Sequence, residues 1–221
     1  LQVVTQNDVS DNGHPFGSAR QISIAGCPVL ALRITYVGEL GWELHLPIEY
    51  AQTIYNTLIE AGSPLGLRNA GYRAIETLRL EKGYRAWSSD IGPDHTPDEA
   101  GLGWAVKMKS NISFKGREAI AIQRAEGIKK IMASFTTDSE VILSGRETIY
   151  RNGERCGWLS SAGFGHTIGK FIGMGYVRND GYIDRDFVLS GEYELEVATK
   201  RVRANVCLKA LYDPKLEKVK T

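Results

Sequence analysis

Alternating apolar and polar positions in the first fifty residues predict a small group of paired strands at 20–47. The run 29–36 carries an apolar residue at every second position, as expected of one strand face. These residues are Leu30, Leu32, Ile34 and Tyr36. Gly26 indicates a turn before this run, and Pro47 ends the last strand of the group.

Apolar spacings of three and four residues predict helices farther along the chain. Residues 48–61 show this pattern and are followed by Gly62. A second helix is expected at 72–82, where Gly83 supplies a natural C-terminal stop. A third, shorter helix is expected at 116–126.

Beyond Gly127 the pattern changes to short alternating runs separated by turns. The expected strands are 130–136, 148–151, 155–160, 171–177, 193–198 and 203–210. The pair Asn152-Gly153 between two apolar runs is a strong hairpin signal. The sequence therefore predicts an α+β protein with a boundary near residue 127 and a small antiparallel barrel or sandwich at 128–221.

Charge and composition narrow the classes of partner. The chain holds 27 Lys and Arg against 26 Asp and Glu, so no overall field favours nucleic acid or an anionic membrane. No apolar run reaches the length of a membrane span, so no membrane association is expected. Three widely spaced cysteines, Cys27, Cys156 and Cys207, fit a reducing compartment. Because the chain starts at Leu1 without a targeting pattern, we expect a fragment of a longer protein.

Several familiar catalytic and metal-binding patterns are absent from the sequence. It has no H-E-x-x-H, no P-loop, no G-x-S-x-G and no clustered metal ligands. The loop expected at 88–103 holds several carboxylates around His95, namely Asp90, Asp94, Asp98 and Glu99. They allow a cation site, but carboxylates that cap turns explain them equally well, and we favour capping.

The segment Tyr36-Val-Gly-Glu39-Leu-Gly-Trp42-Glu43 concentrates a phenol, two carboxylates and an indole around a reversal. A carboxylate can accept two parallel hydrogen bonds from a planar N–C–N edge, which occurs in guanidinium groups and in pterins. The alternative is that Glu39 and Glu43 are exposed on a hairpin while Tyr36 and Trp42 pack in the core. Residue types alone favour that alternative.

The same segment resembles the Y-x-G-E-x-G-x-E element of the glycine-cleavage T-protein (aminomethyltransferase) family. Further matching runs are 77–83 (S-L-R-L-E-x-G), 90–102 (D-I…P-x-E/A-x-x-L), 114–119 (F-I-G-R-E-A) and 157–177, which ends in A-x-G-Y-V. Within the family, 81–87, 99–102 and 149–153 resemble the subgroup fused to flavin-dependent sarcosine and dimethylglycine dehydrogenases. The resemblance extends over nearly the whole chain.

This resemblance implies a partial folate-binding domain at 1–127 and a C-terminal β-barrel domain at 128–221. It implies that Tyr36 and Glu43 hold the pterin of tetrahydrofolate and that Trp104 packs against the folate; Glu39 is the less certain carboxylate. The family's catalytic aspartate and the FAD of the dehydrogenases are expected upstream, so no catalytic residue is assigned here.

One departure bears on the subgroup. Free-standing T-proteins carry an arginine where this chain has Ile75, whereas the dehydrogenase-fused relatives are apolar there, and the folate's carboxylate tail has no assigned partner. The implied function is transfer of one carbon from an N-methylated amine to tetrahydrofolate, in the cytoplasm of a bacterium or the mitochondrial matrix of a eukaryote. A regulatory module, as in a pyruvate dehydrogenase phosphatase subunit, and a bare folate sensor are the alternatives. The oligomeric state is not indicated.

Overall fold

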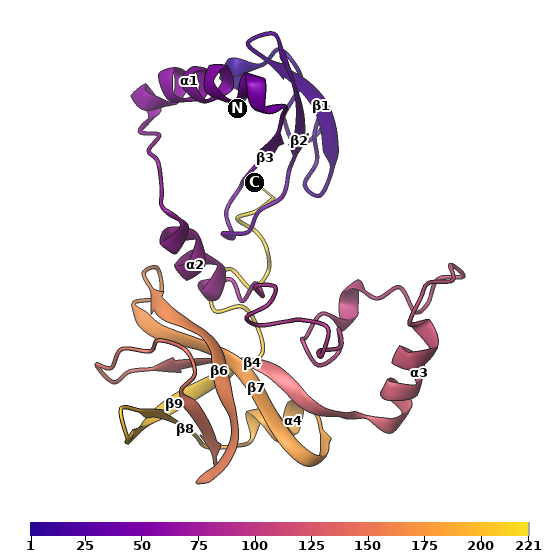
Figure 1. Cartoon of the computed structure of the whole chain (residues 1–221), viewed down its shortest axis with the longest axis vertical. Coiled ribbons are helices and arrows are strands. Elements are labelled where there is room, and N and C mark those ends of the chain that lie inside the picture. The colour runs from indigo at the N-terminus through magenta and orange to yellow at the C-terminus, as the bar shows by residue number, and fades with distance from the viewer. Residues whose placement is uncertain (221) are drawn as a thin grey trace. The chain divides into compact units, whose positions relative to one another are not determined.

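A computed structural model describes residues 1–220 of the chain (Figure 1). Two compact units are present, one formed by Leu1–Ile75 with the end of the chain from Lys215, the other by Glu76–Pro214. The boundary expected near residue 127 falls where helix α3 (Arg117–Glu126) gives way to strand β4 (Ile128–Thr137). As domain limits, 1–127 and 128–221 stay predictions.

The first unit contains a three-stranded antiparallel sheet and one longer helix. Its strands β1 (Ala19–Ile24), β2 (Cys27–Leu32) and β3 (Glu43–His45) pair in that order. Helix α1 (Ala51–Gly62) buries Ile54 against the sheet residues. Three short 3₁₀ helices complete the unit at Gln2–Val4, Ile48–Tyr50 and Ser63–Leu65.

The strand expected at 29–36 is shorter than predicted. Strand β2 ends at Leu32, and its fully buried residues are Val29 and Ala31, which face opposite to the alternating set that ends at Tyr36. The hydroxyl of Thr35 accepts hydrogen bonds from the backbone N–H groups of Val37 and Gly38, at 3.2 and 3.1 Å. This local turn takes the place of ladder bonds, so the chain leaves the sheet before Tyr36.

The helices agree with the predicted spacing. Helix α2 occupies Tyr72–Glu81, and α3 lies where the third helix was expected. Gly83 has φ +67°, a left-handed conformation, and the N–H of Tyr84 donates to the carbonyl of Arg79 at 2.9 Å. Glycine therefore ends α2 in the way its sequence position predicted.

The second unit contains a closed antiparallel barrel of six strands in the order β4-β7-β6-β5-β8-β9. After β4, the strands are β5 (Thr148–Arg151), β6 (Glu154–Gly165), β7 (Lys170–Ile183), β8 (Tyr193–Val197) and β9 (Lys200–Cys207). Asn152 and Gly153 form the β5–β6 turn with φ of 51° and 83°, which confirms the hairpin signal. A barrel, rather than a sandwich, is what the structure shows.

One short helix, α4 (Arg185–Leu189), was not predicted from the sequence. The carboxylate of Asp184 accepts from the N–H of Phe187 at 2.7 Å and so caps the helix. Val188 of this helix is fully buried in the barrel core.

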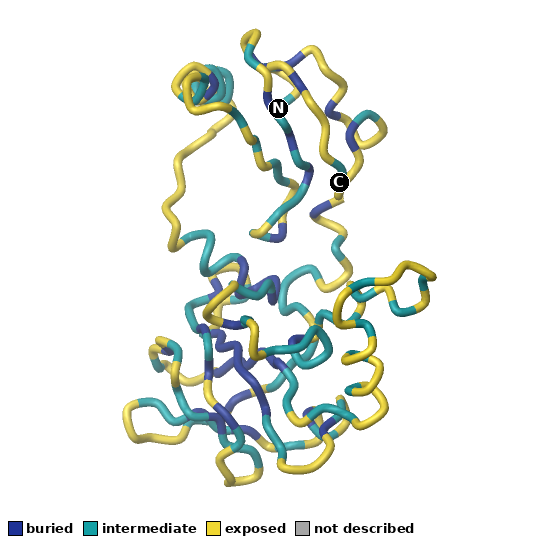
Figure 2. Tube along the Cα trace, turned by 45° about the vertical axis from the view of Figure 1, so that its right-hand side comes forward, coloured by how far each residue is buried: buried dark blue, intermediate teal, exposed yellow. Residues whose placement is uncertain are grey.

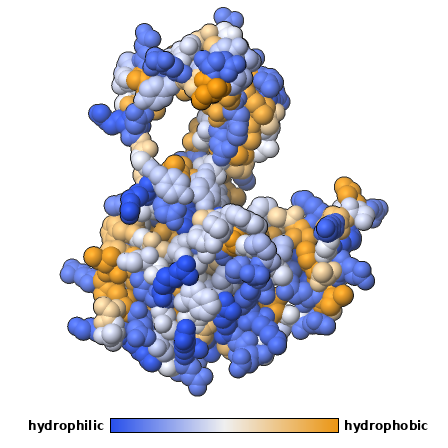
Figure 3. Space-filling view, viewed as in Figure 1, coloured by the Kyte–Doolittle hydropathy of each residue, from blue (hydrophilic) through white to orange (hydrophobic). Residues whose placement is uncertain are grey.

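Runs of consecutive buried residues occur along the barrel strands and form the dark stretches of Figure 2. The interior holds Phe135, Ile149, Leu159, Val177 and Leu195, each fully buried. A second cluster joins Leu80 of α2 to alternate residues of β4 and β7, namely Met132, Ile172, Met174 and Tyr176. Because successive strand residues face opposite sides, α2 covers the outer wall of the barrel. The face of this unit drawn in Figure 3 is mostly hydrophilic.

Candidate functional site

The reversal between β2 and β3 is organised around the indole of Trp42. His14 meets this ring edge-on, with centroids 4.6 Å apart, and the Arg33 guanidinium carbon lies 5.7 Å from its centroid. Arg33 is 2% exposed, donates to the His14 carbonyl at 3.0 Å and pairs with Asp11. Trp42 also packs against the apolar core of the unit, so the expectation that it is a packing residue is confirmed.

The three other side chains singled out in this segment lie at the surface of the first unit. Tyr36 is 38% exposed, so it does not pack in the core as the plainer interpretation expected. Glu39 is exposed, and the Glu43 carboxylate on β3 is about half exposed and lies 3.3 Å from the Nε2 of His45. The reversal thus presents a phenol and two carboxylates beside a partly buried indole. Whether these groups bind a pterin stays a prediction.

Trp104 belongs to the second unit and lies on the 3₁₀ helix Gly103–Ala105, where 79% of it is exposed. The neighbouring residues of the loop enclose a mainly apolar hollow of about 300 Å³. Its lining includes Trp87, Ile91, His95, Pro97, Leu102 and Val106. A flat apolar ring system suits such a surface.

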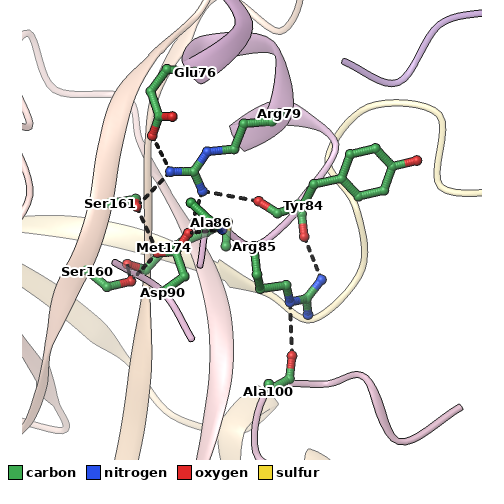
Figure 4. Close-up of polar contacts among 11 residues, drawn as sticks. Glu76, Arg79, Tyr84, Arg85, Ala86, Asp90, Ala100, Ser160, Ser161 and Met174 are labelled. Carbon is green, nitrogen blue, oxygen red and sulfur yellow. Dashed lines mark hydrogen bonds and ion pairs between the residues drawn. The ribbon is translucent and has the colours of Figure 1, made fainter. Parts of the chain in front are cut away.

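Sequence reasoning missed a buried polar network that fastens α2 to the barrel wall (Figure 4). Arg79 donates through Nη1 to Asp90 Oδ2 at 2.5 Å and to the Tyr84 carbonyl at 3.1 Å. Its Nη2 contacts Glu76 and donates to the hydroxyl of Ser161 on β6 at 2.7 Å. The sequence run 79–83 predicts a helix end and belongs to a family motif, but nothing in it indicates that Arg79 binds an acid eleven residues later.

Asp90 also organises the loop that follows α2. Its Oδ2 accepts from the N–H of Ala86 at 2.9 Å, and its Oδ1 accepts from the hydroxyls of Ser160 and Ser161. The expectation that Asp90 caps a turn is confirmed. Glu99 caps in the same way, since its carboxylate accepts from the N–H of Thr96 at 2.9 Å.

Two further contacts tie the end of α2 to the rest of the second unit. The buried carboxylate of Glu81 accepts from the N–H groups of Thr167 and Ile168 at 2.7 and 3.0 Å. The ammonium of Lys82 donates to the Asp213 carboxylate at 2.7 Å. Arg79, Glu81 and Lys82, the charged residues at the end of α2, thus each bind a different partner in the second unit.

His95 of this loop and Tyr176 of β7 form a stacked pair, with ring centroids 4.6 Å apart and an interplanar angle of 18°. Burial raises the pKa of the Tyr176 phenol well above its ordinary value, and nearby Glu99 adds to the effect. Burial and the Lys130 ammonium lower the pKa of His95. Both rings are therefore held in their neutral forms near pH 7.

No group of three or more His, Cys, Asp or Glu suited to a metal ion occurs within residues 1–220. Asp98, one of the candidate ligands, forms an ion pair with Arg124 at 2.7 Å. None of the helices in the described part of the chain is long and apolar enough to cross a membrane.

Comparison with known proteins agrees with the family resemblance. The chain is 43% identical over its whole length to mitochondrial sarcosine dehydrogenase of Mus musculus, of which it covers 24%. It is 35% identical over 81% of its length to the mitochondrial pyruvate dehydrogenase phosphatase regulatory subunit of the same organism, covering 22% of that protein. The chain thus spans about a quarter of the length of these relatives.

A solved relative gives the same result for the fold. The glycine cleavage system aminomethyltransferase T from Bartonella henselae matches with a TM-score of 0.70 and 27% identity, over 80% of this chain and 48% of that one. The sequence model of the GCVT N-terminal domain matches residues 1–110, and that of the glycine cleavage T-protein C-terminal barrel domain matches 130–213. The chain belongs to the glycine-cleavage T-protein family, as its barrel and its Tyr36–Glu43 segment indicated.

Proposed function

We propose that this chain forms the folate-binding portion of a longer enzyme that transfers one carbon unit to tetrahydrofolate. The observation that carries the proposal is the reversal between β2 and β3, which exposes Tyr36 and Glu43 while Trp42 is partly buried against the core. Family membership and the similarity to sarcosine dehydrogenase supply the reaction class.

The groups present suit a pterin. The Glu43 carboxylate, on a strand end and accessible, has the acceptor geometry for the paired N–H donors of the 2-amino-4-oxopyrimidine edge. Tyr36 offers a ring and a hydroxyl seven residues earlier, and Glu39 is a second acceptor on the same turn. Trp104 offers an exposed indole for the flat part of the folate.

The chemistry proposed for the longer protein begins at a flavin, outside this chain. FAD would take two electrons from sarcosine or dimethylglycine to give an iminium. The folate nitrogens would capture its carbon as 5,10-methylene-tetrahydrofolate, and the bond to the original nitrogen would break to release the demethylated amine. Holding the folate nearby raises the effective concentration of the nucleophile and limits hydrolysis to formaldehyde. Residues of this chain would bind and orient the folate, and the catalytic aspartate is expected upstream.

A regulatory role is the second candidate, because the chain is also 35% identical to a pyruvate dehydrogenase phosphatase regulatory subunit. Such a protein would use the same fold to bind and control rather than to catalyse. A longer protein that binds flavin and consumes sarcosine or dimethylglycine, with less formaldehyde released when folate is present, supports the enzymatic role. A longer protein with neither property supports the regulatory role.

The site assignment is tested by calorimetric titration of tetrahydrofolate into the longer protein and its variants. Glu43→Gln replaces one acceptor oxygen with an NH₂ group that faces the ligand's donors, so affinity should fall roughly ten- to a hundredfold. Glu39→Gln should cost less. Glu60→Gln, an exposed change on α1, serves as the matched control and should bind normally. Unchanged affinity in Glu43→Gln rules out the site assignment without touching the fold.

A further inference from the structure

The second unit contains a polar pocket that plays no part in the proposed folate site. It has a volume of about 590 Å³ and lies beside the β5–β6 turn, the end of β7 and α4. Five of its lining residues are basic, namely Lys129, Lys130, Arg151, Arg155 and Arg178, and three are acidic, namely Glu99, Glu154 and Asp180. All of these residues belong to the unit that holds the barrel.

Two of the basic residues are already satisfied inside the protein. The Lys130 ammonium lies 3.6 Å from the Glu99 carboxylate and donates to the carbonyl of Asp94 at 3.0 Å. The Arg151 guanidinium donates to the Phe187 carbonyl at 2.9 Å and covers the ring of that residue. Lys130 and Arg151 therefore line the pocket, but their N–H donors already bind groups of the protein.

Arg178 differs from both. Its guanidinium carbon lies 4.4 Å from the centroid of the Trp158 ring, a cation–π contact that holds the group in the pocket wall. No hydrogen bond or ion pair joins its side chain to another residue between 1 and 220, and its Nε is buried without a partner. A partly buried guanidinium that is held in place and lacks an acceptor carries a desolvation cost that a bound anion would offset.

The surroundings of Arg178 favour a negative ligand of small size. Lys129 and Arg155 are exposed cations of the same pocket and form no ion pair with any described residue. Burial raises the pKa of the Cys156 thiol to about 11, so this lining residue adds no charge near pH 7. Glu154 and Asp180 would repel an extended polyanion, which argues against nucleic acid.

We propose that this pocket binds a small carboxylate ligand, with Arg178 as its central donor. A planar guanidinium can give two parallel hydrogen bonds to one carboxylate group, and Lys129 and Arg155 would add attraction at the rim.

Glutarate titrated calorimetrically into the full chain is the first probe. Arg178→Gln removes the charge and the paired donors, so glutarate affinity should fall by roughly tenfold or more. Arg203→Gln, which removes an exposed arginine of β9 outside the pocket, should leave it within about twofold. Equal affinity in wild type and Arg178→Gln overturns the proposal, as does wild-type protein that does not bind glutarate.

A second set of variants separates recognition from loss of fold. Arg178→Lys keeps the charge but not the paired donors, so glutarate should bind several-fold more weakly while the melting temperature stays near that of wild type. The double variant Lys129→Gln/Arg155→Gln alters exposed side chains only and should weaken binding and reduce its salt dependence. Inorganic phosphate is the competing probe, and binding of phosphate without glutarate overturns the carboxylate assignment.

Discussion

Arg79 and Asp90 form an ion pair at 2.5 Å in which neither side chain is exposed to solvent. The arginine comes from α2 and the aspartate from the loop that follows it, and both also bind Ser161 of β6. One pair of charges thus joins a helix, a loop and the barrel wall. Because buried charges are costly unless fully partnered, this junction is sensitive to loss of either member.

Asp90→Ala should lower the free energy of unfolding by about 3–5 kcal/mol, since it leaves the Arg79 charge buried without its acid. Arg79→Met should cost a similar amount, and the double variant less than the sum, because the two residues share one interaction. Urea unfolding measures all three. Glu140→Gln, an exposed change in the same unit, should stay within about 0.5 kcal/mol of wild type. Fully additive losses would contradict the coupling.

Stability should depend on pH through His95. Burial and Lys130 lower its pKa from the ordinary value of 6.5, so the unfolded chain takes up this proton at a higher pH than the folded one. As the pH falls below about 6.5, the unfolded state therefore binds more protons and the free energy of unfolding decreases, until the pH passes the folded pKa. His95→Gln removes this contribution and should flatten the curve of stability against pH between about 5 and 7.

The comparison needs a matched histidine. His45 on β3 is 57% exposed, and His45→Gln removes one imidazole without disturbing the stacked pair. Urea midpoints from pH 5 to pH 8 should show the flattening in His95→Gln and a curve closer to wild type in His45→Gln. If His95→Gln keeps the whole wild-type slope, this histidine is not its source.

Gly83 should resist replacement. Its φ of +67° lies in the left-handed region, so Gly83→Ala should cost about 1–2 kcal/mol of stability. Gly92 has no left-handed backbone and no atom within 4 Å of an added Cβ, so Gly92→Ala should be nearly neutral. Thermal unfolding of the two variants, measured side by side, distinguishes backbone strain from a general intolerance of the loop. Equal melting temperatures would remove the role given to Gly83.

Much of the fold was accessible from local pattern. The Asn152-Gly153 turn, the stop at Gly83 and the change of period after Gly127 each depend on a few neighbouring residues, and each is present. The end of β2 could not be predicted in this way. The Thr35 hydroxyl binds backbone N–H groups that would otherwise bond to the neighbouring strand, and the alternation of apolar and polar residues does not indicate this.

The site was accessible only in part, for a similar reason. Tyr36, Glu39 and Glu43 lie within eight residues, so a short motif could single them out. The Arg79–Asp90 contact depends on how the loop folds back on α2, and the Ser161 contact spans 82 positions of the chain. Those contacts arise from tertiary packing, and a single sequence carries no signal for them.

The sharpest remaining test of the folate proposal compares two exposed tryptophans. Trp104 and Trp87 are 79% and 69% exposed, and both belong to the loop region after α2. Family resemblance assigns a folate contact only to Trp104. Because ring contacts contribute about 0.5–1.5 kcal/mol beyond burial, Trp104→Ala in the longer protein should weaken tetrahydrofolate binding roughly two- to tenfold.

Trp87→Ala also removes a largely exposed indole and should leave tetrahydrofolate affinity nearly unchanged. Both variants lose a largely exposed side chain, so unfolding midpoints near that of wild type show that any loss of binding is local. Equal losses in the two variants would point to a general effect of the loop and contradict the assignment of Trp104. A loss confined to Trp104→Ala supports the assignment of this residue to the folate.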